Sequence, residues 1–399
     1  MSWTQRLSKA WYAITSSVDG TKLAACSAIG FIYTSTDSGD NWTQVASSQN
    51  WNGIASSAVG KKLAATVNTG YIWTSSDSGA NWTQQTNSGS RSWGGITSSA
   101  DGTKLAAFVY TGTNKFIYTS SDSGITWTQR ATSQNWSSIT SSADGTKLAA
   151  TVNIGNIWTS SDSGVSWTQR ATSQNWYSIT SSADGTKLAA CVYGGFIWTS
   201  SDSGVSWTQR ATSQSWRGIT SSADGTKLAA TVNTGYIWTS VDSGANWTQQ
   251  TNSGSRSWGG ITSSADGTKL AAGVTGGYIY TSTDSGVTWR QQGPSENWIS
   301  ITSSADGTKL AACDNGGYIW KFNYAPVTNY TINGNELNTI FAPYVSGNKS
   351  TLPENIYTAQ INGTTVDLTT LFCPYYETSS TTTNYNYNNT DLKGYFQPL

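Results

Sequence analysis

Apolar and polar positions alternate along most of this chain in short runs that end at turns containing glycine or aspartate. One order of runs recurs about every 40 residues: "WxxIxSS", "KLAAxV", "YIWTS" and "WTQ". Short runs rich in Ile, Val, Thr, Trp and Tyr between such turns are typical of β-strands. Each unit is therefore predicted to form four short strands.

A tryptophan opens each unit, and successive opening tryptophans are 40 to 43 residues apart. They are Trp11, Trp51, Trp93, Trp136, Trp176, Trp216, Trp258 and Trp298. Four strands in about 40 residues are typical of one blade of a β-propeller. We therefore predict an all-β fold with an eight-bladed β-propeller in residues 1–324 and a separate module in residues 325–399.

The two ends of the repeat array complement each other. The eighth unit stops at "GGYIWKFN" without its own "WTQ" run, and the chain begins with a copy of that run at Ser2–Arg6. The N-terminal strand over residues 2–6 is therefore predicted to complete the last blade, which would close the ring and leave no open edge strand. Seven blades with an irregular terminal unit remain the alternative.

Two distant segments are almost identical. Residues 68–107 and 233–272 differ only in Val241, which replaces Ser76. Their offset of 165 residues corresponds to four units. In an eight-bladed ring the two copies would lie opposite each other, so we expect a pseudo-two-fold arrangement.

An aspartate recurs in the frame S-x-D-x-G-x-x-W at one position of seven units. The seven are Asp37, Asp77, Asp122, Asp162, Asp202, Asp242 and Asp284. A carboxylate in such a turn accepts hydrogen bonds from its own backbone, and the glycine supplies a positive φ. We therefore predict that these aspartates stabilise turns and are not catalytic.

This frame resembles the Asp-box, or BNR, repeat of sialidase-like and sortilin-like propellers, and the resemblance covers residues 1–324. It implies that each box forms the hairpin between the third and fourth strands of a blade. It also implies that a sialidase-like glycosidase must be considered. However, the aromatic-Arg-Ile-Pro motif of sialidases is absent, and Pro294 is the only proline in the repeats.

The inventory of other chemical groups is small. Outside the frames and the "DG" turns, the repeats contain only the carboxylates Asp40, Glu296 and Asp314, and the chain has no histidine. Glycoside hydrolysis usually needs two facing carboxylates. We therefore predict no enzymatic activity, no catalytic residue, no metal and no cofactor. Three of the four cysteines follow "KLAA" and are expected to be small buried side chains.

Variable positions on a repeated scaffold are where specificity can reside. The residue after each opening tryptophan changes from unit to unit, and the turn between the second and third runs also varies. Candidate ligand-binding residues are Tyr12, Asn52, Tyr177 and Arg217 after the openers, and Tyr193 in a turn. They are suited to stack on a sugar or to hold a peptide, while sequence drift at exposed loops is the alternative.

Charge and hydropathy limit the possible partners. Lys plus Arg equals Asp plus Glu at 22 each, with no concentrated basic block, so no nucleic-acid partner is expected. No apolar run approaches the roughly 18 residues of a spanning helix, so no membrane insertion is expected. The N-terminus has no signal-peptide pattern, and synthesis in the cytoplasm is expected.

Residues 325–399 form a compositionally distinct tail without tryptophan. Three related phrases, "ELNTIFAPY", "DLTTLFCPY" and "DLKGYFQPL", each begin with an acid suited to a first helical turn and later reach proline. A small α+β repeat module is predicted. Its proposed assembly residues are Leu337, Phe341, Tyr344, Leu368, Phe372, Tyr375, Leu392 and Phe396.

The tail phrases resemble short repeats of structural proteins from large DNA viruses. This resemblance implies an anchoring role through a protein partner. The sequence therefore predicts a non-enzymatic interaction or structural protein, a component of a virus particle or other large assembly. Its propeller would bind a glycan or protein, and its tail would attach it. A sialidase-like glycosidase and an intracellular assembly factor remain alternatives.

Overall fold

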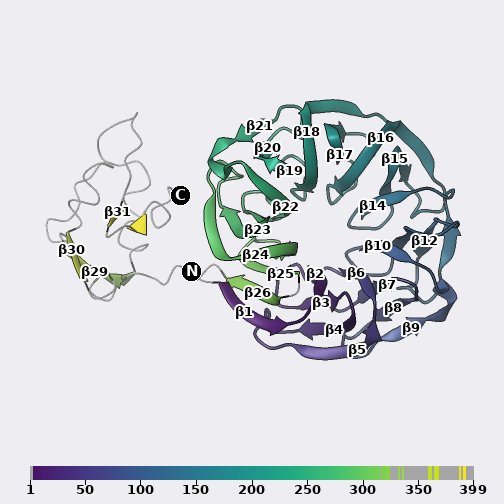
Figure 1. Ribbon diagram of the computed structural model, residues 1–399, viewed down its shortest axis with the longest axis horizontal. Helices are drawn as coiled ribbons and strands as arrows, with labels where there is room; N and C mark the ends of the chain where they lie inside the picture. Colours follow the sequence, from purple (N-terminus) through teal and green to yellow (C-terminus); the bar gives the residue numbers. More distant parts are fainter. Residues whose placement is uncertain are drawn as a thin grey trace. The chain divides into compact units, whose positions relative to one another are not determined.

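The computed structural model describes residues 3–315 and 317–323, together with six short strands between Thr331 and Asp391. The chain divides into two compact units, Met1–Tyr324 and Ala325–Leu399. In the first unit, antiparallel sheets stand side by side around a common centre (Figure 1). Its only described helices are two single 3-10 turns, η1 (Thr86–Ser88) and η2 (Thr251–Ser253).

Three sheets each consist of four strands that follow one another along the chain. The first contains β2 (Trp11–Ser16), β3 (Leu23–Ser27), β4 (Gly30–Ser35) and β5 (Thr43–Gln49). The second contains β6 (Trp51–Ser56), β7 (Leu63–Val67), β8 (Ile72–Ser75) and β9 (Thr83–Gln85). The third contains β10 (Trp93–Ser98), β11 (Leu105–Val109), β12 (Ile117–Ser120) and β13 (Thr128–Arg130). Each sheet begins at an opening tryptophan.

Many of the later strands are long enough to belong to two neighbouring sheets. β16 pairs with β15 through Thr168–Asn175 and with β17 from Trp176 onward, so it joins the fourth strand of one repeat to the first strand of the next. The strands after β13 are β14 (Trp136–Ser141), β15 (Leu148–Ser160), β16 (Thr168–Ser181), β17 (Leu188–Ser200), β18 (Thr208–Ser221), β19 (Leu228–Gly235), β20 (Ile237–Ser240), β21 (Thr248–Gln250), β22 (Arg256–Ser263), β23 (Leu270–Ser282), β24 (Arg290–Ser303), β25 (Lys309–Asp314) and β26 (Tyr318–Asn323).

The first strand of the chain pairs with the last strand of the repeat array. β24 pairs with β25, β25 pairs with β26, and β26 pairs with β1 (Trp3–Ser8). Trp3 lies opposite Phe322, and their rings stack with centroids 5.4 Å apart. The amino-terminal strand thus lies at the end of the strand order β24-β25-β26-β1.

Backbone hydrogen bonds connect the turn after each first strand to the same turn in the next repeat. The Val18 N–H donates to the Ala58 carbonyl at 2.8 Å, and the Ala58 N–H donates to the Ala100 carbonyl at 2.7 Å. The series continues through Ala143, Ala183, Ala223, Ala265 and Ala305. The Ala305 N–H then donates to the Val18 carbonyl at 2.7 Å, so the series returns to its first member.

The opening tryptophans form the core of the sheets. All eight are buried, and Trp216 is representative. Its ring packs edge-on against Trp238 at 6.0 Å and lies 6.4 Å from Trp247. Such aromatic pairs contribute about 0.5–1.5 kcal/mol beyond the burial of their area. The opening tryptophans are therefore packing residues and are not exposed platforms for a ligand.

Three cysteines are buried among these aromatic residues. Cys26, Cys191 and Cys313 are fully buried free thiols. Burial raises the pKa of the Cys26 and Cys191 thiols to about 12. They therefore act as small apolar side chains. Cys373 lies outside the described residues.

In the second unit, the described strands form three short antiparallel pairs. They are β27 (Thr331–Ile332) with β28 (Asn335–Glu336), β29 (Thr358–Ile361) with β30 (Thr364–Asp367), and β31 (Asn386–Tyr387) with β32 (Thr390–Asp391). The acids expected to begin helices, Glu336, Asp367 and Asp391, are instead the last residues of β28, β30 and β32. The eight predicted assembly residues lie outside the described residues.

Candidate functional site

The connections between strands fall on two opposite faces of the first unit, because successive strands of each repeat run in opposite directions. One face, here called the box face, carries the first-to-second and third-to-fourth connections, with the "DG" turns and the aspartate frames. The other, here called the opener face, carries the remaining connections and the start of each opening strand. On the box face, the Ser38 N–H donates to the Thr21 carbonyl at 2.8 Å and joins the two kinds of turn.

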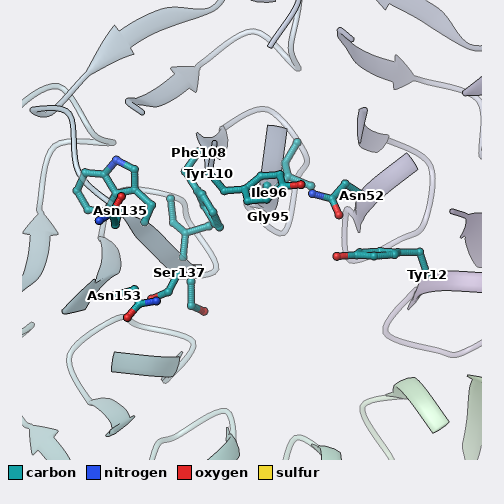
Figure 2. A pocket seen from close by; sticks show the side chains of 13 residues that line it. Tyr12, Asn52, Gly95, Ile96, Phe108, Tyr110, Asn135, Ser137 and Asn153 are labelled. Carbon is teal, nitrogen blue, oxygen red and sulfur yellow. The ribbon is translucent and has the colours of Figure 1, made fainter. Parts of the chain in front are cut away.

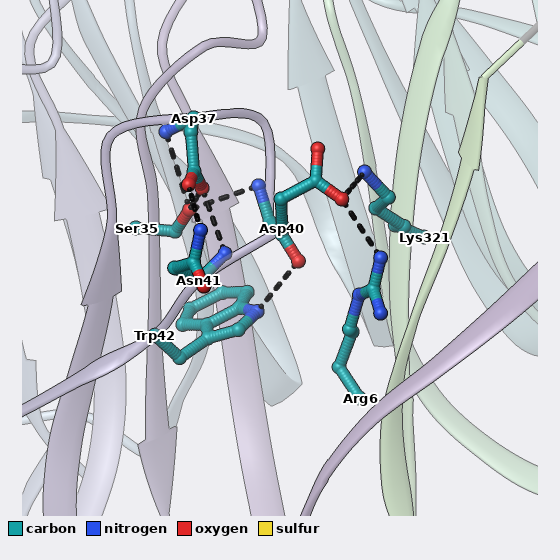
Figure 3. Close-up of polar contacts among 8 residues, drawn as sticks. Arg6, Ser35, Asp37, Asp40, Asn41, Trp42 and Lys321 are labelled. Atoms are coloured by element: carbon teal, nitrogen blue, oxygen red, sulfur yellow. Dashed lines mark hydrogen bonds and ion pairs between the residues drawn. The ribbon is translucent and has the colours of Figure 1, made fainter.

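The frame aspartates hold their own turns. Figure 3 shows Asp37, whose carboxylate accepts hydrogen bonds from the Asn41 N–H at 2.9 Å and the Ser35 hydroxyl at 2.8 Å. Bonds from Asn41 are the main reason that the pKa of Asp37 is lowered to about 2. The Trp42 indole donates to the Gly39 carbonyl at 3.1 Å. The other six frames show the same carboxylate bonds.

The "DG" turns are built in a similar way. Asp144 accepts a bond from the Ser142 hydroxyl at 2.5 Å and from the Thr146 N–H at 3.0 Å, and these bonds lower its pKa to about 2. Lys147 of the same repeat donates to the carbonyl of Asp184 in the next repeat at 3.0 Å. The repeated acids of the box face therefore stabilise turns and the contacts between repeats.

The opener face carries the variable residues. Tyr12 and Tyr177 directly follow opening tryptophans and are 43% and 44% exposed. Tyr193 lies in β17 directly after its five buried residues and is 43% exposed, while Asn52 and Arg217 are half-buried. All five predicted ligand-binding residues therefore lie on this face.

A cavity of about 600 Å³ opens on the opener face. The residues after the opening tryptophans of four consecutive repeats line it, namely Tyr12, Asn52, Gly94 and Ser137. Figure 2 shows Tyr12 and Asn52 on one side and Ser137 and Asn153 on the other. Residues more than 140 positions apart in the chain thus share one site.

Hydrogen bonds fix several walls of this cavity. The Asn52 amide donates to the Trp93 carbonyl at 2.7 Å, and Lys115 donates to the Asn135 side-chain oxygen at 2.6 Å. Burial, with a smaller contribution from Tyr110, raises the pKa of the Tyr12 hydroxyl. Tyr12 therefore stays protonated at neutral pH. The lining offers neutral hydrogen-bonding groups beside aromatic rings.

Three of the predicted residues gather at a second place. Tyr177 on β16 and Tyr193 on β17 have ring centroids 6.2 Å apart. Tyr193 pairs with Ser215, two residues before Arg217 on β18. The structure therefore divides the predicted set: Tyr12 and Asn52 line the cavity, Tyr177 and Tyr193 are in ring contact outside it, and Arg217 lies on the strand beside Tyr193.

The three carboxylates outside the repeated turns differ in their surroundings. Asp40 forms ion pairs with Arg6 at 2.7 Å and Lys321 at 2.5 Å (Figure 3), and the bond from Lys321 is the main cause of its lowered pKa. Asp314 is buried and accepts bonds from the Tyr318 N–H and the Trp320 indole, both at 2.9 Å. Glu296 lies on β24 opposite Gly277.

In the part of the chain that the structure describes, no three His, Cys, Asp or Glu side chains gather in a way that could hold a metal ion. No helix there is long and apolar enough to cross a membrane.

Some cavity residues were missing from the predicted set. Tyr110 and Ser137 occupy variable positions of the repeat, and that variability was a usable signal. Asn153 occupies the same variable position as Tyr110, but asparagine recurs there as Asn68 and Asn233, so its residue type did not distinguish it. Asn135 belongs to a repeated "QNW" phrase, so the sequence did not distinguish it from the same asparagine in other repeats.

No family model matches the chain, and no curated protein matches it. Solved structures do resemble it. YCF48 from Cyanidioschyzon merolae is 17% identical, with a TM-score of 0.52 over 81% of this chain and 99% of that chain. A structure of YCF48 bound to D1 peptide is 15% identical, with a TM-score of 0.53 over 80% of this chain and 96% of that chain.

The C-terminal WD40 domain of Sif2 is 12% identical, with a TM-score of 0.64 over 80% of this chain and 98% of that chain. At these identities the likeness concerns the fold alone. These neighbours are β-propellers, and the sheets of this chain are blade-like. The prediction of an all-β propeller is therefore confirmed.

Proposed function

We propose that this chain is a non-enzymatic interaction protein, an eight-bladed propeller that binds an extended segment of a partner protein on its opener face. The observation that carries this proposal is the separation of the two faces. Repeated acids fill the box face with hydrogen-bonded turns, whereas the variable residues of four repeats line one cavity on the opener face. Variable side chains on a rigid repeated scaffold are the usual basis of specificity.

Three observations support a closed ring of eight blades. The series of turn hydrogen bonds passes through eight repeats and returns from Ala305 to Val18. The N-terminal strand β1 pairs with β26 of the last repeat. Asp40 of the first repeat forms an ion pair with Lys321 of the last repeat. A closed ring would leave no edge strand free to pair with another chain.

The seven aspartate frames support the further proposal that the blades are Asp-box repeats. In each frame the carboxylate accepts a hydrogen bond from the backbone N–H four residues later. This bond gives the aspartate a structural role, which fits a propeller that acts through binding.

A protein segment is the ligand we favour for the cavity. Its lining supplies amide side chains, a hydroxyl and tyrosine rings, which match the alternating donors and acceptors of an extended backbone. A similar propeller, YCF48, has been solved bound to D1 peptide. A glycan would use the same groups and is therefore the competing ligand in the test.

The proposal is tested with a variant that alters only the cavity. Tyr12→Ala combined with Tyr110→Ala removes two cavity-lining rings, and Val165→Ala with Val205→Ala is the matched change on the box face. Proteins of the native source are cross-linked to each variant and identified by mass spectrometry. We expect one partner to be lost with the cavity variant and retained with the box-face variant.

Other outcomes of this comparison contradict the proposal. Equal capture by both variants would place the binding surface elsewhere. Binding on a glycan array that disappears only with the cavity variant would favour a glycan ligand, and hydrolysis of that glycan would favour the glycosidase alternative.

The tail leads to a second proposal, that the chain is a component of a virus particle or another large assembly. Its support is the three short strand pairs, each followed in the sequence by a Leu-containing phrase that reaches proline. Recovery at a fixed ratio with intact particles in a density gradient of the native source would support this assignment. Recovery only as free protein would contradict it and favour an assembly factor with transient partners.

A further inference from the structure

A cationic aromatic cluster on the opener face lies outside the cavity already described. Its members, Tyr177, Tyr193 and Arg217, come from the consecutive strands β16, β17 and β18. The two tyrosine rings have centroids 6.2 Å apart with planes inclined by 35°, and both are more than 40% exposed. Tyr193 lies opposite Ser215, so Arg217 is only two residues further along the neighbouring strand.

The pseudo-two-fold relation of the repeats provides an internal comparison. Residues 165 positions earlier in the chain are Tyr12, Ala28 and Asn52. Only Tyr12 matches its counterpart, since Ala28 replaces the second tyrosine ring and Asn52 replaces the guanidinium. The combination of a guanidinium with two tyrosine rings therefore occurs in only one of the two sets of positions that are 165 residues apart.

The two polar side chains at this position are also used differently. The Asn52 amide is engaged, because it donates to the Trp93 carbonyl at 2.7 Å. For Arg217, no hydrogen bond or ion pair is formed with any described residue. The residue after the next opening tryptophan is Gly259, which has no side chain to cover the guanidinium. Arg217 thus retains its full hydrogen-bonding capacity for an external ligand.

Among residues 3–315 and 317–323, the charges on the opener face leave Arg217 without a counter-ion. Two carboxylates lie on this face within residues 3–323, Glu296 on β24 and Asp314 on β25. Asp314 is buried and accepts bonds from Tyr318 and Trp320. Glu296 lies opposite Gly277 of β23 in the sheet of the next repeat, and no ion pair joins it to Arg217. A half-buried guanidinium without a counter-ion attracts an anionic group.

We propose that Arg217, Tyr177 and Tyr193 form a binding site for the carboxylate of an Asp or Glu side chain in a partner protein segment. The guanidinium offers two parallel N–H donors to the carboxylate, and a tyrosine hydroxyl is able to donate a further hydrogen bond. The two exposed rings supply flat apolar surface for the neighbouring residues of the segment. This inference rests on the proposed function, because it defines the chemistry of the segment that the opener face recognises.

The experiment starts from the full chain and a phage-displayed library of random linear heptapeptides. Peptides selected on the chain are sequenced. The strongest binder is synthesised with a fluorescent label, both as selected and with its acidic residue replaced by the amide. Dissociation constants are measured by fluorescence anisotropy.

Two variants and a control isolate the guanidinium. Arg217→Asn installs the residue that the opposite repeat already carries as Asn52, so the fold is expected to tolerate it. Tyr193→Ala likewise installs the residue found at Ala28. Lys61→Gln removes one positive charge from an exposed residue of the box face and controls for net charge. Thermal unfolding of each variant verifies that it folds.

We expect the selected peptides to be enriched in Asp or Glu at one position. Arg217→Asn should raise the dissociation constant of the best peptide about 10- to 100-fold, which is the effect of losing a hydrogen bond to a charged group. Replacing the peptide acid by its amide should weaken binding to the original chain by a similar factor. The Arg217→Asn variant should bind the acid and amide peptides with nearly equal affinity. Lys61→Gln should change binding less than twofold.

Failure of this inference differs from failure of the proposed function. Selected peptides without an acidic preference, or equal affinity for the original chain and Arg217→Asn, would overturn the carboxylate site and leave the peptide-binding function standing. If no peptide were selected, the proposed function would itself be contradicted, and with it the present inference.

Discussion

Replacing Asp40 by alanine should destabilise the propeller through its contact between the first and last repeats. At the other frame glycines, the neighbouring residue from the third strand of the preceding repeat is a threonine, and the residue after the glycine is apolar. Thr34 and Ala80 are one such pair. Here those positions hold Lys321 and Asp40, whose charged atoms are 2.5 Å apart. Removing Asp40 would leave the lysine without its counter-ion.

The size of the effect follows from the exposure of the two side chains. The Asp40 side chain is 51% exposed, whereas that of Lys321 is only 8% exposed. An exposed ion pair contributes about 0.2–1 kcal/mol, and breaking a fully buried pair costs about 3–5 kcal/mol. Because one partner is buried and the other is half in solvent, we expect Asp40→Ala to reduce the free energy of unfolding by about 1–3 kcal/mol.

The assay is a double-mutant cycle measured by urea unfolding with tryptophan fluorescence. Lys321→Thr combined with Asp40→Ala recreates the pair of residues found at Thr34 and Ala80. The double variant should recover most of the stability lost by Asp40→Ala, which gives a coupling energy of about 1–2 kcal/mol. A loss below about 0.5 kcal/mol for Asp40→Ala, or no recovery in the double variant, would refute the reasoning.

Three further predictions concern the turns, the contacts between repeats and the thiols. Hydrogen bonds lower the pKa of Asp101 from 3.8 to about 2 in the folded chain, so its stabilising contribution is present above about pH 4 and is lost as the pH falls toward 2. The urea midpoint should therefore fall over that range, and a constant midpoint would contradict this account. Gly79→Ala places a Cβ 2.5 Å from Thr34 Cγ2 at a backbone φ of +87°. We expect this variant to lose about 1–3 kcal/mol of unfolding free energy, measured by urea titration, and Thr34→Ser to restore part of the loss. Cys26 and Cys191 should resist a thiol reagent until the chain unfolds, as measured by peptide mass spectrometry, because both are fully buried; rapid labelling of the native chain would show that the sheets open.

Much of the fold was predictable because it depends on interactions between residues that are close in the sequence. Each strand run ends at a turn whose aspartate and glycine fix the backbone locally, as Asp37 and Gly39 do, so the repeat unit is visible without tertiary information. The strand ends at Glu336, Asp367 and Asp391 were mistaken for helix starts, because an acid before a leucine suits either a hairpin or a first helical turn.

The candidate site was predictable only in part. Variability after the opening tryptophans identified Tyr12 and Asn52, but it could not separate them from Arg217, since one-dimensional variability carries no distances. Asn135 and Asn153 line the same cavity although their repeats look ordinary. Their role depends on which neighbouring side chains leave space, and that is a property of packing.

The sequence by itself determined the repeat, the strands within it, the structural role of the frame aspartates and the positions at which residues vary from repeat to repeat. These features depend on contacts between residues close in the chain, so a repeated local pattern is sufficient to specify them. Only the tertiary structure decided that Tyr12 and Ser137 share a cavity, that the rings of Tyr177 and Tyr193 are in contact outside it, and that Asp40 forms an ion pair with Lys321. The physical reason is that these neighbours lie many residues apart, and their proximity arises from how the sheets are arranged around a common centre.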